Sequence, residues 1–147
     1  KSNMKKIMML ALGVAAVMSC SKDDENNDQA SIIGTWKESK TVVYNGSNNA
    51  VLATELPDDC DKKNTYDFTD SGKLHTKTFY TKSDGTCADD GNFTYSYSYD
   101  AGTKKIIVDG ESSDVLALTS SELQIVVDMN DENGDGVDDK VVLVLYR

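Results

Sequence analysis

Polar and apolar residues alternate without exception along residues 93–99, which read Phe-Thr-Tyr-Ser-Tyr-Ser-Tyr. Successive side chains of a β-strand point to opposite faces, so the aromatic rings share one face and the small hydroxyl side chains share the other. A strict period of two is typical of a strand with one face against a core and the other in solvent. The sequence therefore predicts a half-buried strand at 93–99.

Further segments show the same pattern in a weaker form. They are residues 36–44, 64–68, 73–80, 105–108, 115–118, 122–128 and 140–146. Turn formers such as Asn45-Gly46 and the run 69–72 separate some of them. Longer polar loops are expected at 46–61, 81–91 and 129–139.

The order of these segments predicts the fold class. Eight short strands joined mainly by hairpin-type turns favour an all-β, eight-stranded antiparallel up-and-down barrel. Closure of the barrel would remove the unpaired edges that an open sheet presents to solvent. A two-sheet β-sandwich is the alternative. No helix is predicted in the domain, which we place at residues 31–147.

The N-terminal residues form a different kind of segment. Lys5 and Lys6 precede an apolar stretch at 7–18, which is shorter than the ~20 residues that span a bilayer and has the length of a signal-peptide core. The stretch ends in Val17-Met18-Ser19-Cys20, which resembles the lipobox of bacterial lipoproteins. The resemblance implies a signal peptide at 1–19 and a lipid on Cys20 that attaches the protein to the membrane. An ordinary signal peptide is the alternative.

Residues 20–30 read CSKDDENNDQA, which is polar, acidic and without periodicity. Such a segment is expected to be a disordered tether between the lipid and the domain. Its acidic run at 21–25 resembles the export signal of some Gram-negative lipoproteins. This implies a lipid-anchored protein of the outer membrane that is exposed on the cell surface. A location facing the periplasm is the alternative.

The charge of the chain narrows the range of partners. The formal net charge is −10, and it is more negative in the part that follows the leader, because the leader holds lysines but no acid. A surface of this kind repels nucleic acid and anionic headgroups. No nucleic-acid partner is therefore expected.

Two cysteines besides Cys20 remain to be assigned. In an oxidising compartment, Cys60 and Cys87 are expected to pair. Closing the segment between them would stabilise the fold by roughly 3–4 kcal/mol. A metal pair and a catalytic thiol are the alternatives, but His75 is the only histidine of the chain and is expected at the surface.

The start of the domain, Ile32-Ile33-Gly34-Thr35-Trp36, resembles the G-x-W signature of lipocalin-like proteins. The order of Cys60, residues 65–68 and residues 70–72 is similar to that of small lipocalin-like lipoproteins of Gram-negative bacteria. The resemblance implies that Trp36 closes one end of the barrel beside an arginine from the end of the sheet, a place that Arg147 occupies.

An eight-stranded barrel holds one small ligand or is filled by its own side chains. The aromatic residues that would line a ligand site are Tyr66, Phe68, Phe93, Tyr95, Tyr97 and Tyr99. In a filled barrel the same rings would form the core.

Residues 131–139 read Asp-Glu-Asn-Gly-Asp-Gly-Val-Asp-Asp and match seven positions of an EF-hand-type calcium loop, the first six and the ninth. The oxygen ligands would come from Asp131, Asn133, Asp135, Val137 and Asp139. The twelfth position is Val142 instead of a bidentate glutamate, so we expect a weak, structural calcium ion. A glycine-rich turn that binds no ion is the alternative.

Motifs of catalysis do not stand out. The chain has no G-x-S-x-G or H-E-x-x-H motif and no glycine-rich loop between a strand and a helix, so an enzyme is not expected.

The leading hypothesis is a surface-anchored lipocalin-like barrel that binds a small apolar or aromatic ligand. The alternative is a filled, calcium-stabilised barrel that acts as an interaction module for a surface protein or glycan.

Overall fold

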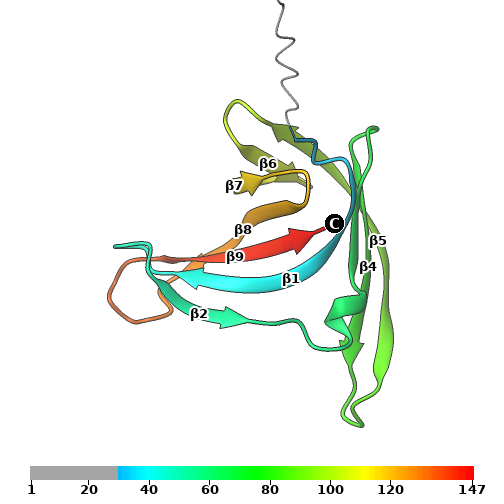
Figure 1. The fold of residues 1–147 in the computed structure, drawn as a ribbon, viewed down its shortest axis with the longest axis horizontal. Coiled ribbons are helices and arrows are strands. Elements are labelled where there is room, and N and C mark those ends of the chain that lie inside the picture. The colour runs from blue at the N-terminus through cyan, green and yellow to red at the C-terminus, as the bar shows by residue number, and fades with distance from the viewer. Residues whose placement is uncertain (1–29) are drawn as a thin grey trace, which may run out of the picture.

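The computed structural model describes residues 30–147, which form one antiparallel sheet that curls round on itself (Figure 1). Its elements are β1 (Gly34–Tyr44), β2 (Val51–Glu55), the short 3-10 helix η1 (Asp61–Lys63), β3 (Thr65–Phe68), β4 (Lys73–Thr81), β5 (Cys87–Asp100), β6 (Lys105–Val108), β7 (Glu111–Leu118), β8 (Glu122–Asn130) and β9 (Asp139–Tyr146).

The sheet closes between its first and last long strands. Each strand from β3 to β9 pairs with the next one in the chain, and β9 returns to pair with β1. The other edge of β1 is shared, because residues 34–36 pair with β3 whereas residues 41–44 pair with β2. Together β2 and β3 take the place of one strand, which makes a closed eight-stranded barrel. The predicted fold class is confirmed, and the β-sandwich alternative is wrong.

The strand β2 lies in a segment that we predicted to be a loop. All five of its residues are exposed, and in the described part of the chain the strand pairs only with β1. Since no core covers either face, no alternation of polar and apolar residues is required there. The pattern that revealed the other strands is therefore missing.

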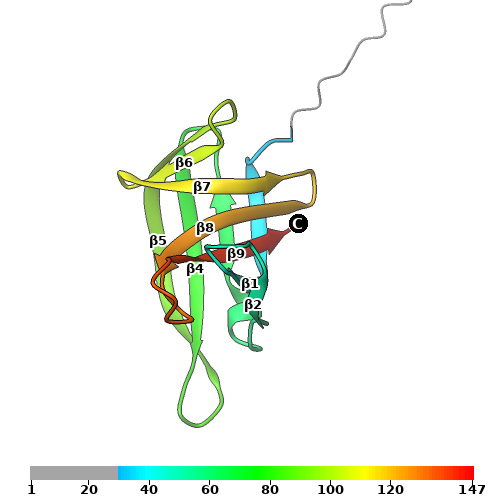
Figure 2. The same ribbon diagram turned by 90° about the vertical axis from the view of Figure 1, so that its left-hand side faces the viewer.

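The predicted loop 81–91 is also mostly strand. The ladder between β4 and β5 continues through Phe79↔Asp89 to Thr81↔Cys87, and this hairpin projects well beyond the barrel (Figures 1 and 2). Backbone hydrogen bonds maintain the pairing beyond the reach of the core. The sequence Thr-Cys-Ala-Asp-Asp-Gly consequently shows no periodicity even though most of it is β-strand.

The strand β7 begins earlier than predicted, at Glu111 instead of Val115. The turn before it consists of Asp109 and Gly110, whose φ angles are 48° and 89°. Two positive φ angles are the requirement of a type I′ hairpin turn, which joins two strands directly. The polar residues 111–114 are thus held in the sheet by the turn and by pairing with β6.

The main core lies inside the barrel around Trp36, which is fully buried. The other buried members of this cluster are Ile32, Phe68, Leu74, Ile106, Val115, Leu123 and Leu145. The strand β9 is covered on both faces, because Leu143 and Leu145 pack with this cluster while Val142 and Val144 belong to a second one.

A disulfide joins Cys60 to Cys87, with the two Cα atoms 5.3 Å apart, and this confirms the predicted pairing. The bond connects the residue before η1 to the first residue of β5. Nearby, the backbone N–H of Phe79 donates a hydrogen bond of 2.8 Å to the side-chain oxygen of the buried Asn64. The projecting hairpin is therefore attached to the segment that leads into β3.

The predicted signal peptide (1–19) and the lipid-bearing Cys20 lie outside the described residues, as does the acidic tether apart from Ala30. Among the described residues, no helix has the length and apolar character needed to cross a membrane.

Candidate ligand site

A groove of about 450 Å³ lies along the inner face of β3, β4, β5 and β6. Its walls consist of Tyr66, Leu74, Thr76, Thr78, Asp90, Phe93, Tyr95 and Val108. Several of these side chains, among them Tyr66 and Tyr95, also pack against the barrel core. The groove is thus continuous with the interior of the barrel.

Three of the six aromatic residues predicted to contact a ligand line this groove. The strand register places Tyr66 opposite Thr76 and Thr76 opposite Phe93, so these side chains lie in one row on the same face. The rings of Phe93 and Tyr95 are stacked, with centroids 6.4 Å apart. Phe93 remains 42 % exposed, so part of its ring is open to a ligand.

The other three aromatic residues have packing roles. Phe68 is buried and meets Tyr97 edge to face, with ring centroids 5.0 Å apart. The hydroxyl of Tyr97 donates a hydrogen bond of 2.7 Å to the carbonyl of Thr69. Tyr99 also packs against the core and lines a hollow of about 170 Å³. Together with Tyr97 it lines another hollow of about 400 Å³ beside residues 30–33, so only the buried Phe68 has the purely filling role of the filled-barrel interpretation.

Tyr66 lines the groove and lies opposite Trp36 of β1, two residues before Glu38. Burial, and then the negative charges of Glu38 and Asp61, raise the pKa of Tyr66 to about 12. Its hydroxyl therefore stays protonated at neutral pH and remains available as a hydrogen-bond donor.

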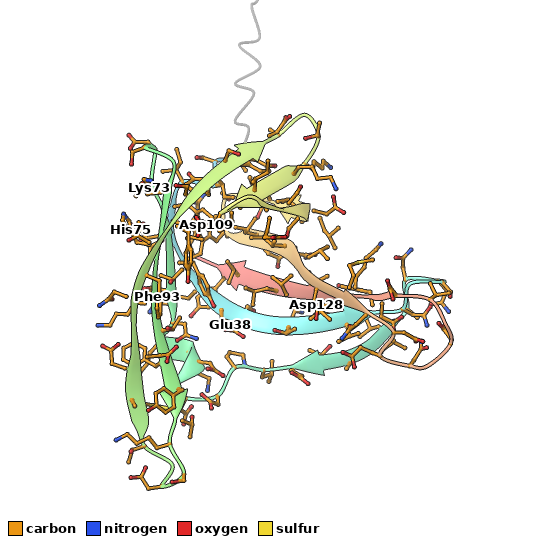
Figure 3. The ribbon with its side chains drawn as sticks, turned by 180° about the vertical axis from the view of Figure 1, so that it is seen from behind. Glu38, Lys73, His75, Phe93, Asp109 and Asp128 are labelled. Atoms are coloured by element: carbon orange, nitrogen blue, oxygen red, sulfur yellow. A yellow bond between two sulfur atoms is a disulfide. The ribbon has the colours of Figure 1, made fainter. Side chains whose placement is uncertain are left out.

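Glu38 lies on β1 two residues after Trp36, and both side chains share one face of the strand. Burial raises the pKa of the Glu38 carboxyl, and the charges of Asp61 and Asp58 raise it further. Figure 3 shows Glu38 on β1 and Phe93 on β5, which is separated from β1 by β3 and β4 in the sheet. Our sequence analysis missed Glu38, although its spacing from Trp36 already placed it on the inner face.

At the hairpin end of the groove, Asp90 accepts a hydrogen bond of 3.2 Å from the Thr78 hydroxyl. The ammonium groups of two lysines of this region, Lys63 and Lys77, lie 5.9 and 5.3 Å from the ring centroid of Phe79.

His75 is exposed on the outer face of β4, and its Nδ1 lies 2.9 Å from the Thr94 hydroxyl oxygen.

At one end of the barrel the guanidinium carbon of Arg147 lies 4.1 Å from the ring centroid of Trp36. The guanidinium donates hydrogen bonds to the carbonyls of Ile33, Ser31 and Ser120, at 2.6, 3.0 and 2.8 Å. The indole N–H of Trp36 donates to the carbonyl of Ile32 at 2.8 Å. The structure thus brings together the two residues to which the sequence assigned closure of the barrel.

Gly34 allows this arrangement. Its φ of +128° lies in a region that side chains rarely adopt, and a Cβ atom there would be 2.9 Å from a guanidinium nitrogen of Arg147. The glycine and the tryptophan of the G-x-W sequence thus both lie against Arg147.

The sequence profile of the lipocalin-like domain matches residues 32–125. The chain belongs to the lipocalin-like domain family. The matched region of this lipocalin-like domain includes Gly34, Trp36 and the whole groove, and it confirms the family resemblance read from the sequence.

One solved structure is similar, the deswapped triple mutant of bovine odorant binding protein. It is 16% identical to this chain, with a TM-score of 0.38, and the alignment covers 78% of this chain and 72% of that one. No curated protein sequence gives a significant match.

The predicted calcium loop of the lipocalin-like domain connects β8 to β9. Its acidic side chains accept hydrogen bonds from backbone N–H groups of the same loop. Asp131 accepts from Asp135 and Gly136 at 3.0 and 2.9 Å. Asn133 accepts from Asp135 at 2.8 Å, and Asp135 accepts from Val137 at 2.9 Å.

Asp139 is fully buried and connects two loops. It accepts hydrogen bonds from the N–H groups of Gly46, Glu132 and Asn133, at 2.8, 3.0 and 3.3 Å. Within residues 30–147, no group of three or more histidine, cysteine, aspartate or glutamate side chains is arranged to hold a metal ion. Calcium binding by this loop stays a prediction.

Proposed function

We propose that this lipocalin-like domain binds a small apolar or aromatic molecule in the groove. The observation that carries the proposal is the stacked pair Phe93 and Tyr95 in a groove of about 450 Å³, next to Tyr66. Small-molecule sites in proteins typically measure roughly 300–1,000 Å³ and are lined mainly by apolar and aromatic side chains.

The polar groups of the groove are few and suit the orientation of a ligand. The hydroxyls of Thr76 and Thr78 stand along β4 at the same inner face as Tyr66 and Phe93. A mostly apolar wall supplies affinity by burying ligand surface, and a few hydroxyls fix the pose of the ligand. The combination supports recognition of a ring-containing molecule.

Replacing Phe93 by alanine should weaken the binding of the apolar fluorescent probe N-phenyl-1-naphthylamine by about fivefold, because an aromatic contact contributes about 1 kcal/mol beyond the buried area. Both core clusters and the closure of the sheet lie within residues 30–147, so this domain is titrated by itself. The measurement is the dissociation constant from probe fluorescence.

The matched control is Ile107→Ala. Ile107 is 41 % exposed, close to the 42 % of Phe93, and it lies on β6 between Ile106 and Val108, which face inward. This variant should bind the probe like the wild type. Equal affinity of all three proteins would rule out the groove as the site. Native mass spectrometry of the purified domain, with calcium present, would also reveal a retained ligand or a bound calcium ion.

We further propose that the domain is held at the outer membrane by a lipid on Cys20 and faces the outside of the cell. The lysines at 5 and 6, the apolar stretch 7–18 and the sequence Val17-Met18-Ser19-Cys20 support the anchor, and the acidic residues 21–25 support surface exposure.

Globomycin, which inhibits lipoprotein signal cleavage, should cause the uncleaved precursor to accumulate, and a clickable palmitate analogue should label the wild type but not Cys20→Ala. Normal maturation in the presence of globomycin would contradict the anchor. Digestion of intact cells with an external protease separates surface exposure from the alternative location facing the periplasm.

A further inference from the structure

The groove has an acidic boundary as well as an aromatic lining. Tyr66 lines the groove and lies opposite Trp36 in the register of β1 and β3, and Glu38 is the next residue on that face of β1. Asp90 adds a carboxylate to the groove wall at the hairpin end. The groove therefore has one carboxylate in its wall, that of Asp90, and lies next to a second one, that of Glu38, beyond Tyr66.

Among residues 30–147, Glu38 forms no ion pair. The three ion pairs among residues 30–147 involve Lys62, Lys77 and Lys105, and none of them includes Glu38. The charged groups that act on Glu38 are Asp61 and Asp58, and both repel its charge. A half-buried carboxylate next to two other negative charges is unfavourable until a cation approaches it.

We propose that the groove selects small organic cations, namely molecules with a flat aromatic or apolar body and a protonated amine. The body lies against Phe93 and Tyr95, and the amine points past Tyr66 toward the Glu38 carboxylate. The inference rests on the proposed function, because it specifies which small molecules the same groove binds.

Two further electrostatic effects favour cations over anions in this groove. A cation near the faces of Tyr66, Phe93 and Tyr95 is attracted by their π-electrons. The net charge of −10 attracts cations to the surface and repels anions. Fatty acids and other apolar carboxylates are consequently poor candidates for this groove.

The test compares three probes that share an indole ring and differ in charge. Tryptamine is cationic at neutral pH, tryptophol is its neutral isostere, and indole-3-propionate is anionic. Isothermal titration of residues 30–147 at moderate salt should show that tryptamine binds about tenfold more tightly than tryptophol, the combined effect of an ion pair and a cation–π contact. Indole-3-propionate should bind most weakly.

The decisive variant is Glu38→Gln. It should remove the preference for tryptamine and leave the affinity for tryptophol unchanged. The variant should fold at least as stably as the wild type at neutral pH, because the folded environment disfavours the charged carboxylate; thermal unfolding checks this. The matched control, Glu132→Gln, removes an exposed charge from the β8–β9 loop, far from β4 and β5 (Figure 1), and should retain the preference.

The possible failures are distinguishable. If the wild type binds the three indoles equally, or binds indole-3-propionate best, the charge selection is overturned while ligand binding stands. The same conclusion follows if Glu38→Gln weakens tryptamine and tryptophol equally, or if Glu132→Gln also removes the preference. If neither the indoles nor N-phenyl-1-naphthylamine binds, the proposed function fails together with the inference.

Discussion

Replacement of Trp36 by alanine should lower the free energy of unfolding by about 3–5 kcal/mol, the usual cost of removing a large aromatic side chain from a core. Trp36 is fully buried, donates a hydrogen bond to the carbonyl of Ile32 and lies under the guanidinium of Arg147. Its loss therefore creates a cavity and also removes the surface on which the arginine rests.

Urea denaturation followed by circular dichroism measures this effect. Trp36 is the only tryptophan of the chain, so its fluorescence cannot report on the variant. The control is Tyr80→Ala, which removes an aromatic side chain that is 50 % exposed and should cost less than about 0.5 kcal/mol. Similar losses in the two variants would contradict the role assigned to Trp36.

The barrel and its closure could be predicted from the sequence because both depend on residues that face a core. Each inward-facing strand shows an alternation that burial imposes. Gly34, Trp36 and Arg147 are identified by residue type and order alone, since the φ of +128° at position 34 suits glycine and a Cβ atom there would crowd the Arg147 guanidinium that lies on Trp36. The family match over residues 32–125 is consistent with this.

The groove could be predicted only in part. The alternation in residues 93–99 places the four aromatic rings of β5 on one face, but it does not say where the packed interior ends. The structure shows that this face passes from the core at Tyr97 to the groove at Phe93. That change depends on the partner strands, because Phe93 lies opposite the small, polar Thr76 whereas Tyr95 lies opposite Leu74, a member of the core cluster.

The remaining differences between the predicted and the observed strands arise where the chain does not pack against a core. The strand β2 and the outer part of the β4–β5 hairpin are held by backbone pairing. Such pairing does not require polar and apolar residues to alternate, so the sequence pattern does not reveal these strands. The β-bulge between Glu38 and Lys40 also interrupts the alternation along β1, so that Trp36 belongs to the main core whereas Val42, six residues later, belongs to the second cluster.

The second large effect on stability is expected from loss of the disulfide that attaches the projecting hairpin. Replacement of both Cys60 and Cys87 by alanine should lower the free energy of unfolding by roughly 3–4 kcal/mol, because the bond closes a loop with a sequence separation of 27 and so restricts the unfolded chain. Alanine suits the site, since Cys60 is only 2 % exposed. Urea denaturation under oxidising conditions measures the difference.

Loss of the disulfide should also loosen the projecting hairpin locally, in addition to lowering the free energy of unfolding. The disulfide is the covalent link between the η1 segment and β5, so its removal should increase hydrogen exchange at the amides of residues 79–81 and 87–89, which pair in the hairpin, more than at those of β8 and β9. Reduction of the wild-type protein should reproduce both effects. An unchanged free energy of unfolding would show that core packing alone stabilises the barrel. Since β5 continues from Cys87 to Phe93 and Tyr95, faster exchange that also extends to residues 90–95 would show that the disulfide holds the groove wall in place.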